Sequence, residues 1–178
     1  MFGNGGCRMK GNVVSRYGKV NDVNIYYLTA ASGPPVVLIH GFGGSASYWQ
    51  LNIEPLAEHF AVYAPDMVGS GCSDKPRAKY SLKYLDQMVN GFVDALELGR
   101  VSLIGHSLGG AIVLEFAVAH PDKVRKLVLV SSAGLGSGLS FPPLLLSTPA
   151  LLNWVLFGPS PAPGLSSSAQ APHAGHLG

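Results

Sequence analysis

The chain has 178 residues, which is enough for one domain with a buried core and too few for two ordinary domains. Twelve basic and ten acidic side chains give a formal net charge of +2, and the basic residues are scattered, which argues against a nucleic-acid partner. Only 12% of the residues are charged, against about 25% in a typical soluble domain. The shortfall is local, because the 52 residues after Lys126 contain no Asp, Glu, Lys or Arg.

The ends of the sequence and its cysteines bear on localisation. The first ten residues, MFGNGGCRMK, lack the apolar core of a secretory signal, and Cys7 and Cys72 show neither metal-ligand nor disulfide spacing. The apolar stretch 141–157 is interrupted by three prolines and Asn153, and it is shorter than the ~20 residues that a membrane span requires. We therefore expect a cytoplasmic protein without a membrane-spanning segment.

The first half of the chain predicts strands around one helix. Residues 13–29 combine β-branched and aromatic residues around a polar centre, which is typical of an antiparallel pair of strands. The continuous apolar run VVLIH at 36–40 and the run FAVYA at 60–64 are typical of strands buried on both faces. Between these two runs the pattern of residues 46–58 predicts a helix, in which Pro55 makes continuity less certain.

The second half continues the alternation. Ser81 is a plausible N-cap for a helix whose apolar residues recur at helical spacing, namely Leu82, Leu85, Val89, Phe92 and Leu96. A strand at 101–104, a helix at 111–119 and a strand at 126–130 follow. Strands that alternate with helices predict an α/β fold, with a mostly parallel sheet built from right-handed βαβ units and flanked by helices.

The segment with the most chemical information is Gly-His-Ser-Leu-Gly-Gly, which begins at Gly105 between a predicted strand and a predicted helix. In the Gly-x-Ser-x-Gly spacing, Gly105 and Gly109 allow the strand and the helix to pass close to each other. The side chain of Ser107, which follows His106, projects outward. Ser107 is then a candidate nucleophile, and the N–H of Leu108 and the helix dipole are suited to stabilise an oxyanion. The alternative is a turn of small residues that merely packs well.

A second Gly-rich segment, His-Gly-Phe-Gly-Gly, begins at His40 directly after the apolar run VVLI. Together with the serine motif, this segment makes the chain resemble the α/β-hydrolase superfamily of esterases, lipases and C–C hydrolases. The resemblance implies an oxyanion hole formed by the N–H groups of Phe42 and Leu108, with Gly41 and Gly43 shaping the loop.

The resemblance also covers the turn at residues 66–74, which is similar to the loop that the family carries after its next strand. The family places its triad acid after the nucleophile in chain order, so Asp66 and Asp74 are predicted to form turns and not to take part in catalysis. For His40 we expect hydrogen bonds that hold its loop, in preference to a direct contact with substrate.

The rest of a catalytic triad is difficult to find. A serine hydroxyl needs an adjacent histidine as base, and a carboxylate must orient that histidine. The candidate acids and bases after Ser107 are Glu115, Asp122, His120, His173 and His176. Glu115 lies on the following helix, and Asp122 and His120 lie at its far end, which puts His120 roughly 20 Å from Ser107. The last two histidines lie in the C-terminal segment. A flexible segment cannot hold a base in near-attack geometry, so we expect little or no triad-dependent activity.

The resemblance implies an incomplete fold, because the family continues with further parallel strands and a final helix after the strand at 126–130, and the composition of this chain changes there. Gly, Pro, Ser and Ala make up 16 of the last 21 residues, which is typical of disorder. The resulting division is a disordered N-terminus at 1–12, the N-terminal part of an α/β-hydrolase domain at 13–136, the start of a helical cap at 137–157 and a disordered tail at 158–178. We expect a C-terminally truncated hydrolase in which the strand 126–130 is an exposed apolar edge suited to self-association.

These observations favour a serine hydrolase that acts on an ester, amide or C–C bond through Ser107 and is impaired because the triad acid and histidine are missing. A non-catalytic truncated fragment, or a remnant that binds a ligand or a protein, is the alternative. A weaker alternative is a dinucleotide-binding oxidoreductase, because Gly41-x-Gly43-x-x-Ala46 and the later Asp66 fit a relaxed fingerprint.

Little in the sequence defines the ligands. No zinc or phosphate-loop motif is present, so neither a metal nor a cofactor is expected, and the expected partner is a small-molecule substrate. Some large apolar side chains are compatible with an apolar acyl group, although they fit an ordinary core equally well; they are Phe42, Trp49, Phe141 and Trp154.

Overall fold

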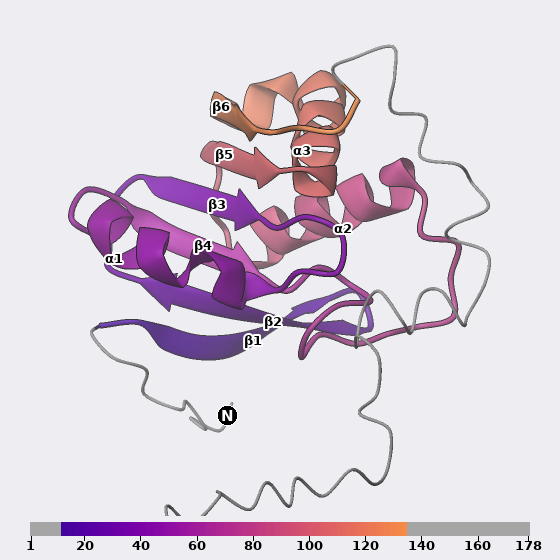
Figure 1. Cartoon of the computed structure of the whole chain (residues 1–178), viewed down its shortest axis with the longest axis horizontal. Coiled ribbons are helices and arrows are strands. Elements are labelled where there is room, and N and C mark those ends of the chain that lie inside the picture. The colour runs from indigo at the N-terminus through magenta and orange to yellow at the C-terminus, as the bar shows by residue number, and fades with distance from the viewer. Residues whose placement is uncertain (1–11, 135–178) are drawn as a thin grey trace, which may run out of the picture. The chain divides into compact units, whose positions relative to one another are not determined.

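The computed structural model describes residues 12–134, which form a six-stranded sheet in the order β1-β2-β4-β3-β5-β6 (Figure 1). Strands β1 (Val14–Val20) and β2 (Val23–Ala30) make an antiparallel hairpin that turns at Asn21 with a positive φ of 52°. Asn tolerates this left-handed conformation better than most residues. The predicted antiparallel pair is therefore confirmed.

The other four strands form the parallel part of the sheet. They are β3 (Pro35–Ile39), β4 (Ala61–Pro65), β5 (Val101–His106) and β6 (Val124–Val130). Strand β3 pairs in parallel with β4 and with β5, β5 pairs in parallel with β6, and β2 joins the hairpin to β4 in antiparallel orientation. The predicted α/β fold with a mostly parallel sheet is confirmed.

The helices lie close to their predicted positions. They are a 3-10 turn at Ala46–Trp49, α1 (Gln50–Ala57), α2 (Leu82–Ala95), α3 (Leu108–Ala119) and a 3-10 turn at Pro121–Lys123. Ser81 caps α2 as predicted, since its hydroxyl accepts a hydrogen bond of 3.2 Å from the N–H of Tyr84. Helix α1 continues past Pro55, and α3 starts directly after Ser107, where the Gly-x-Ser-x-Gly motif predicts the N-terminus of a helix.

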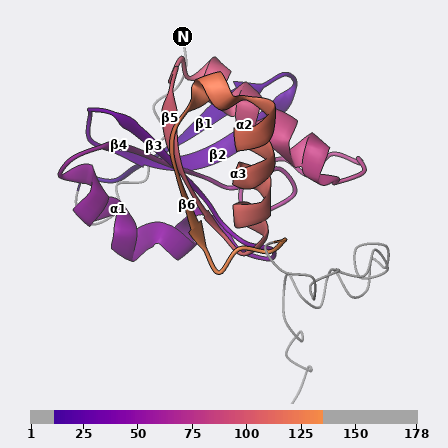
Figure 2. The same ribbon diagram turned by 90° about the horizontal axis from the view of Figure 1, so that it is seen from above.

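The helices form two layers on opposite faces of the sheet (Figure 2). Helices α2 and α3 cover one face, where Phe92, Phe116 and Leu103 belong to one core cluster, and α1 covers the other face, where Ile53 and Trp49 join a second core cluster. Fully burying an apolar side chain of this size is worth roughly 1.5–3 kcal/mol. Trp49 therefore belongs to this core cluster.

This topology brings two loops together, because β3 and β5 are parallel neighbours and the residues that follow them emerge at the same edge of the sheet. The predicted cap at 137–157, the predicted tail at 158–178 and nearly all of the predicted disordered N-terminus lie outside the described residues. Within the described part of the chain, no helix has the length and apolarity needed to cross a membrane.

Candidate active site

Ser107 occupies the sharp turn between β5 and α3, where its backbone adopts φ 53° and ψ −117°. Such a conformation costs a residue with a side chain on the order of 1–3 kcal/mol. Hydrogen bonds hold it in place: the N–H of Ser107 donates to the carbonyl of Val130 (3.0 Å), and its carbonyl accepts from the N–H groups of Gly110 (3.0 Å) and Ala133 (2.9 Å). The strand-to-helix turn predicted from the Gly-x-Ser-x-Gly spacing is present.

The glycines of this turn allow very close backbone packing. A methyl group at Gly109 would lie 2.3 Å from the carbonyl oxygen of Ile39, and one at Gly105 would lie 2.4 Å from the carbonyl oxygen of Gly109. A methyl group at Gly110 would lie 2.4 Å from the hydroxyl oxygen of Ser132. The positions around Ser107 therefore need glycine for steric reasons, as the motif predicted.

The loop that follows β3 lies directly against this turn. A methyl group at Gly41 would lie 3.0 Å from Cβ of Ser107, and the N–H of Gly44 closes the loop by donating to the carbonyl of Gly41 at 3.1 Å. The segments that carry the predicted oxyanion donors, the N–H groups of Phe42 and Leu108, therefore meet. Leu108 is the first residue of α3, so its N–H has no carbonyl partner within the helix.

His40 holds the loop in place, as expected from the sequence. Its ring is 3% exposed; Nδ1 lies 2.7 Å from the carbonyl oxygen of Gly41, and Nε2 accepts a hydrogen bond of 3.0 Å from the N–H of Met67. Because Nε2 accepts, the proton of the neutral ring lies on Nδ1. Burial lowers the pKa of His40, against smaller opposing effects of the hydrogen bond to Gly41 and of the charge of Asp66, so the neutral form is favoured.

Asp66 ties two loops together through its buried carboxylate. One oxygen accepts from the N–H of Ala46 and the other from the N–H of Cys72, both at 2.6 Å. Asp74 similarly accepts from the main-chain N–H of Asn24 at 2.7 Å. Both aspartates organise turns, as expected. The carboxylate of Asp66 is committed to these bonds and is not free for the ribose contact that the dinucleotide-binding alternative requires.

An aromatic neighbour of the turn escaped the sequence prediction. The ring of Tyr48 stacks on that of His106 with centroids 6.3 Å apart and planes 27° apart. Nδ1 of His106 is buried without a hydrogen-bond partner among the described residues, and the position of a methyl group at Gly41 would be 3.1 Å from it. A tyrosine six residues beyond Phe42 carries no motif, so only the fold reveals this contact.

The described candidates for base and acid lie away from Ser107. His120 follows the last residue of α3, and this helix of twelve residues is about 18 Å long. Its Nε2 instead lies 3.5 Å from a carboxylate oxygen of Asp86 on α2. Glu115 is exposed on α3 and Asp122 is exposed beyond it, whereas the two later histidines lie outside the described residues. Residues 12–134 therefore contribute a serine and two loops to the site, but no adjoining base.

Metal chemistry has no support in this part of the chain. Among residues 12–134, no group of three or more His, Cys, Asp or Glu side chains is arranged to hold a metal ion.

Comparison with known proteins agrees with this geometry. The family model for the alpha/beta hydrolase fold matches residues 34–160, and the chain belongs to this family. A 2-hydroxy-6-oxo-2,4-heptadienoate hydrolase of Pseudomonas putida is 41% identical over 113 residues, which cover 61% of this chain and 41% of that protein. A soluble epoxide hydrolase of Corynebacterium sp. is 32% identical over 151 residues, covering 84% of this chain and 52% of that protein.

Solved structures show the same relationship. A bacterial membrane phospholipase A superposes with a TM-score of 0.70 at 34% identity, covering 72% of this chain and 42% of that one. The chain spans about a third to a half of the length of the curated relatives it matches. These three relatives bear the names of hydrolases with different substrates, so the similarity establishes the α/β-hydrolase family and does not identify a reaction.

Proposed function

We propose that Ser107 is the nucleophile of a serine hydrolase that attacks the carbonyl carbon of a small-molecule ester, amide or ketone. The observation that carries this proposal is the strained backbone of Ser107 at the N-terminus of α3, with the loop at Gly41 packed against it. Such strain persists only where the surrounding structure maintains it, and it is concentrated at functional sites.

The chemistry follows from the groups that meet at the turn. The oxygen of Ser107 bonds to the carbonyl carbon, its proton passes to a base, and the carbonyl oxygen becomes an oxyanion that the N–H groups of Phe42 and Leu108 stabilise. The leaving group then departs with a proton, and water hydrolyses the acyl-serine. An apolar acyl group suits this site, because Phe42 and the Tyr48–His106 stack supply apolar surface nearby.

The names of the relatives narrow the range of substrate classes that we propose. The Pseudomonas enzyme is named for a 6-oxo acid and the solved structure for a phospholipase A, so ketone and ester substrates both fit attack on a carbonyl carbon. We favour these two substrate classes over an epoxide, which offers no carbonyl carbon to the serine.

The 178-residue chain is expected to be a poor catalyst, since no base adjoins Ser107 among residues 12–134. In a well-studied serine protease, removing the triad histidine costs about 10⁶ in turnover, whereas the oxyanion hole and binding retain about 10³–10⁴ over water. If the chain catalyses no reaction at all, the alternative of a non-catalytic truncated fragment replaces this proposal.

A boronic acid tests the nucleophile and the oxyanion donors without requiring turnover. We expect phenylboronic acid to form a tetrahedral adduct with the chain, seen in ¹¹B NMR as loss of the trigonal signal, and Ser107→Ala to abolish that adduct. Ser102→Ala, which changes a serine of β5, the strand that precedes Ser107, is the matched control and should leave the adduct intact. An adduct that survives in Ser107→Ala would contradict the assignment.

Ester hydrolysis with added imidazole tests the missing base. With p-nitrophenyl butyrate, we expect the chain to exceed Ser107→Ala by at most about tenfold, and we expect imidazole to raise the rate of the chain more than that of the variant, because a diffusible base replaces the histidine. Fast turnover without imidazole that disappears in Ser107→Ala would show that a base is present and that the chain is not impaired. Equal rates for both proteins, with and without imidazole, would count against a nucleophilic Ser107.

A further inference from the structure

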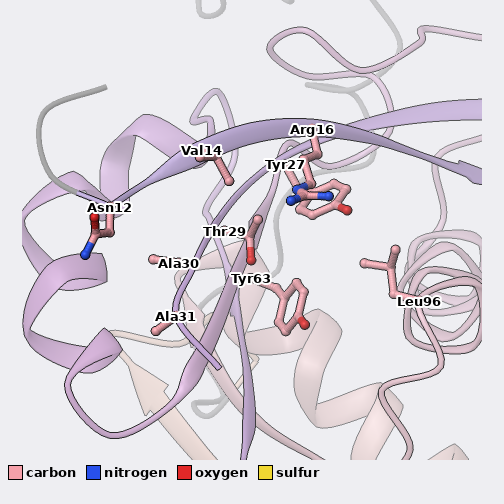
Figure 3. A pocket seen from close by; sticks show the side chains of 9 residues that line it. All are labelled: Asn12, Val14, Arg16, Tyr27, Thr29, Ala30, Ala31, Tyr63 and Leu96. Carbon is pink, nitrogen blue, oxygen red and sulfur yellow. The ribbon is translucent and has the colours of Figure 1, made fainter. Parts of the chain in front are cut away.

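A second concave site lies on the face of the sheet that carries α2, away from Ser107. It is a cavity of about 400 Å³ over β1, β2 and β4, and Leu96 at the C-terminal end of α2 forms part of its wall (Figure 3). It shares no lining residue with the turn around Ser107, which follows β5 on the other side of β3. Pockets for small ligands usually measure about 300–1,000 Å³, so the space is sufficient for a compact ligand.

The register of three neighbouring strands builds the floor of this cavity. Val14 on β1 pairs with Thr29 on β2, and Thr29 pairs in turn with Tyr63 on β4, so these side chains form one row across the sheet. Arg16 and Tyr27 form the adjacent row, two residues away on their strands and therefore on the same face. The arrangement depends on strand pairing and not on a flexible loop.

The polar side chains of this cavity can all donate hydrogen bonds. Among its described lining residues, Arg16 carries the single charge and no carboxylate is present. Thr29, Tyr27 and Tyr63 add hydroxyl groups, which Figure 3 shows around the same space. Burial raises the pKa of Tyr27, although the positive charge of Arg16 opposes this, so its hydroxyl keeps its proton at neutral pH. These groups favour an anion.

The remaining walls favour a flat apolar body attached to that anion. The rings of Tyr27 and Tyr63 lie with centroids 6.2 Å apart, and Val14 and Leu96 contribute aliphatic surface. Aromatic rings prefer aromatic neighbours at offset or edge-on geometry, and a single guanidinium neutralises a single negative charge. We propose that this cavity binds a small aromatic monocarboxylate, with the carboxylate at Arg16 and the ring against Tyr27 and Tyr63.

Titration of the ¹⁵N-labelled 178-residue chain with sodium benzoate tests the proposal by NMR. We expect saturable shifts of the backbone amides of residues 14–16 and 27–31, with no shift at Phe42 or Leu108. Benzamide, which lacks the charge, and acetate, which lacks the ring, should each bind more weakly than benzoate. Acetate shifts equal to those of benzoate would overturn the aromatic assignment, and an absence of saturable shifts would overturn the site.

Variants separate this cavity from the site at Ser107. Arg16→Gln should weaken benzoate binding about three- to fivefold, since an exposed ion pair contributes modestly. Arg125→Gln changes an exposed arginine on β6 and is the matched control; it should leave the affinity unchanged, as should Ser107→Ala. Equal loss of benzoate affinity in Arg125→Gln and Arg16→Gln would show that the effect comes from net charge and would overturn the role of Arg16. Loss of affinity in Ser107→Ala would show that benzoate binds at the site around Ser107 and not in this cavity.

Discussion

Buried polar side chains at single positions shape the loops around Ser107. His40 supplies hydrogen bonds to the main chain at Gly41 and Met67, and Asp66 supplies them at Ala46 and Cys72. Loops lack the regular hydrogen bonds of helices and sheets, so their buried main-chain N–H and C=O groups need other partners. A buried polar group without a hydrogen-bond partner costs about 1–3 kcal/mol. The geometry of the candidate site thus depends on side chains that need not touch a substrate.

His40→Ala should destabilise the chain by about 2–3 kcal/mol near pH 8, because two buried main-chain groups lose their partner. The pKa of His40 is lowered by folding, so its stabilising contribution is complete above the unfolded value of about 6.5 and is lost as the pH falls towards the folded value. The difference in the free energy of unfolding between the two proteins should therefore shrink from pH 8 to pH 5.5. Urea unfolding at several pH values measures it.

The exposed histidine His59 provides the control for that experiment. His59→Ala removes an imidazole from the surface after α1, and its effect should be small at every pH. A difference between His40→Ala and the unchanged chain that stays constant from pH 8 to pH 5.5 would contradict the assignment of a neutral, buried His40.

Besides His40 and Asp66, Asp86 is a buried ionisable side chain among the described residues, and it lies at the contact between α2 and the end of α3. Asp86 is 4% exposed on α2 and faces His120, while Lys123 beyond α3 bonds to Asn90 and Asp94 of α2. A buried carboxylate is costly unless it is fully paired, and an oxygen of Asp86 has no hydrogen-bond partner among the described residues. This contact therefore makes stability depend on pH.

Asp86→Asn should remove part of that dependence. Burial raises the pKa of Asp86 above 3.8, with His120 opposing and Glu115 reinforcing the shift. Its contribution to stability is complete below the unfolded pKa and is lost as the pH rises through the folded value. Relative to the unchanged chain, the variant should gain in the free energy of unfolding as the pH rises from 4 to 7. Asp22→Asn, at the exposed hairpin turn, should gain nothing, and parallel pH profiles for Asp86→Asn and the unchanged chain would contradict the prediction.

At the scale of the molecule, the two edges of the sheet differ in their protection. Strand β1 carries Arg16 and Lys19 along its length, whereas the second half of β6 is uncharged and exposes Val128 and Val130 at 46% and 41%. Within residues 12–134, no strand pairs with the outer side of β6. Charged side chains are a common protection of edge strands, so among the described residues β6 is the less protected edge.

We expect the chain to self-associate through β6, with a weight-average mass in analytical ultracentrifugation that rises with protein concentration. Val130→Lys should reduce this association, because a charge on the edge opposes pairing with a second strand. Leu51→Lys replaces the most exposed large apolar residue of α1 and is the matched control. Equal reduction by both variants would assign the association to general hydrophobicity, and an unchanged mass for Val130→Lys would exclude β6.

Local patterns predict much of the fold because they depend on short-range physics. The Ser81 cap, the alternation of β3 to β6 with helices and the tight turn at Ser107 all follow from propensities and spacing within a few residues. The start of α3 follows from the same motif, because the turn at Ser107 leads directly from a strand into a helix.

The family, the parallel sheet and the serine at a strand-to-helix turn can be predicted from the sequence, because each depends on spacing along the chain. The folded structure adds the strand order, the packing of Gly41 on Ser107, the stack of Tyr48 on His106 and the cavity at Arg16. Those features join residues that are distant in the chain. Contacts of that kind exist only once strand pairing has fixed which residues share a face, and no local propensity specifies that pairing.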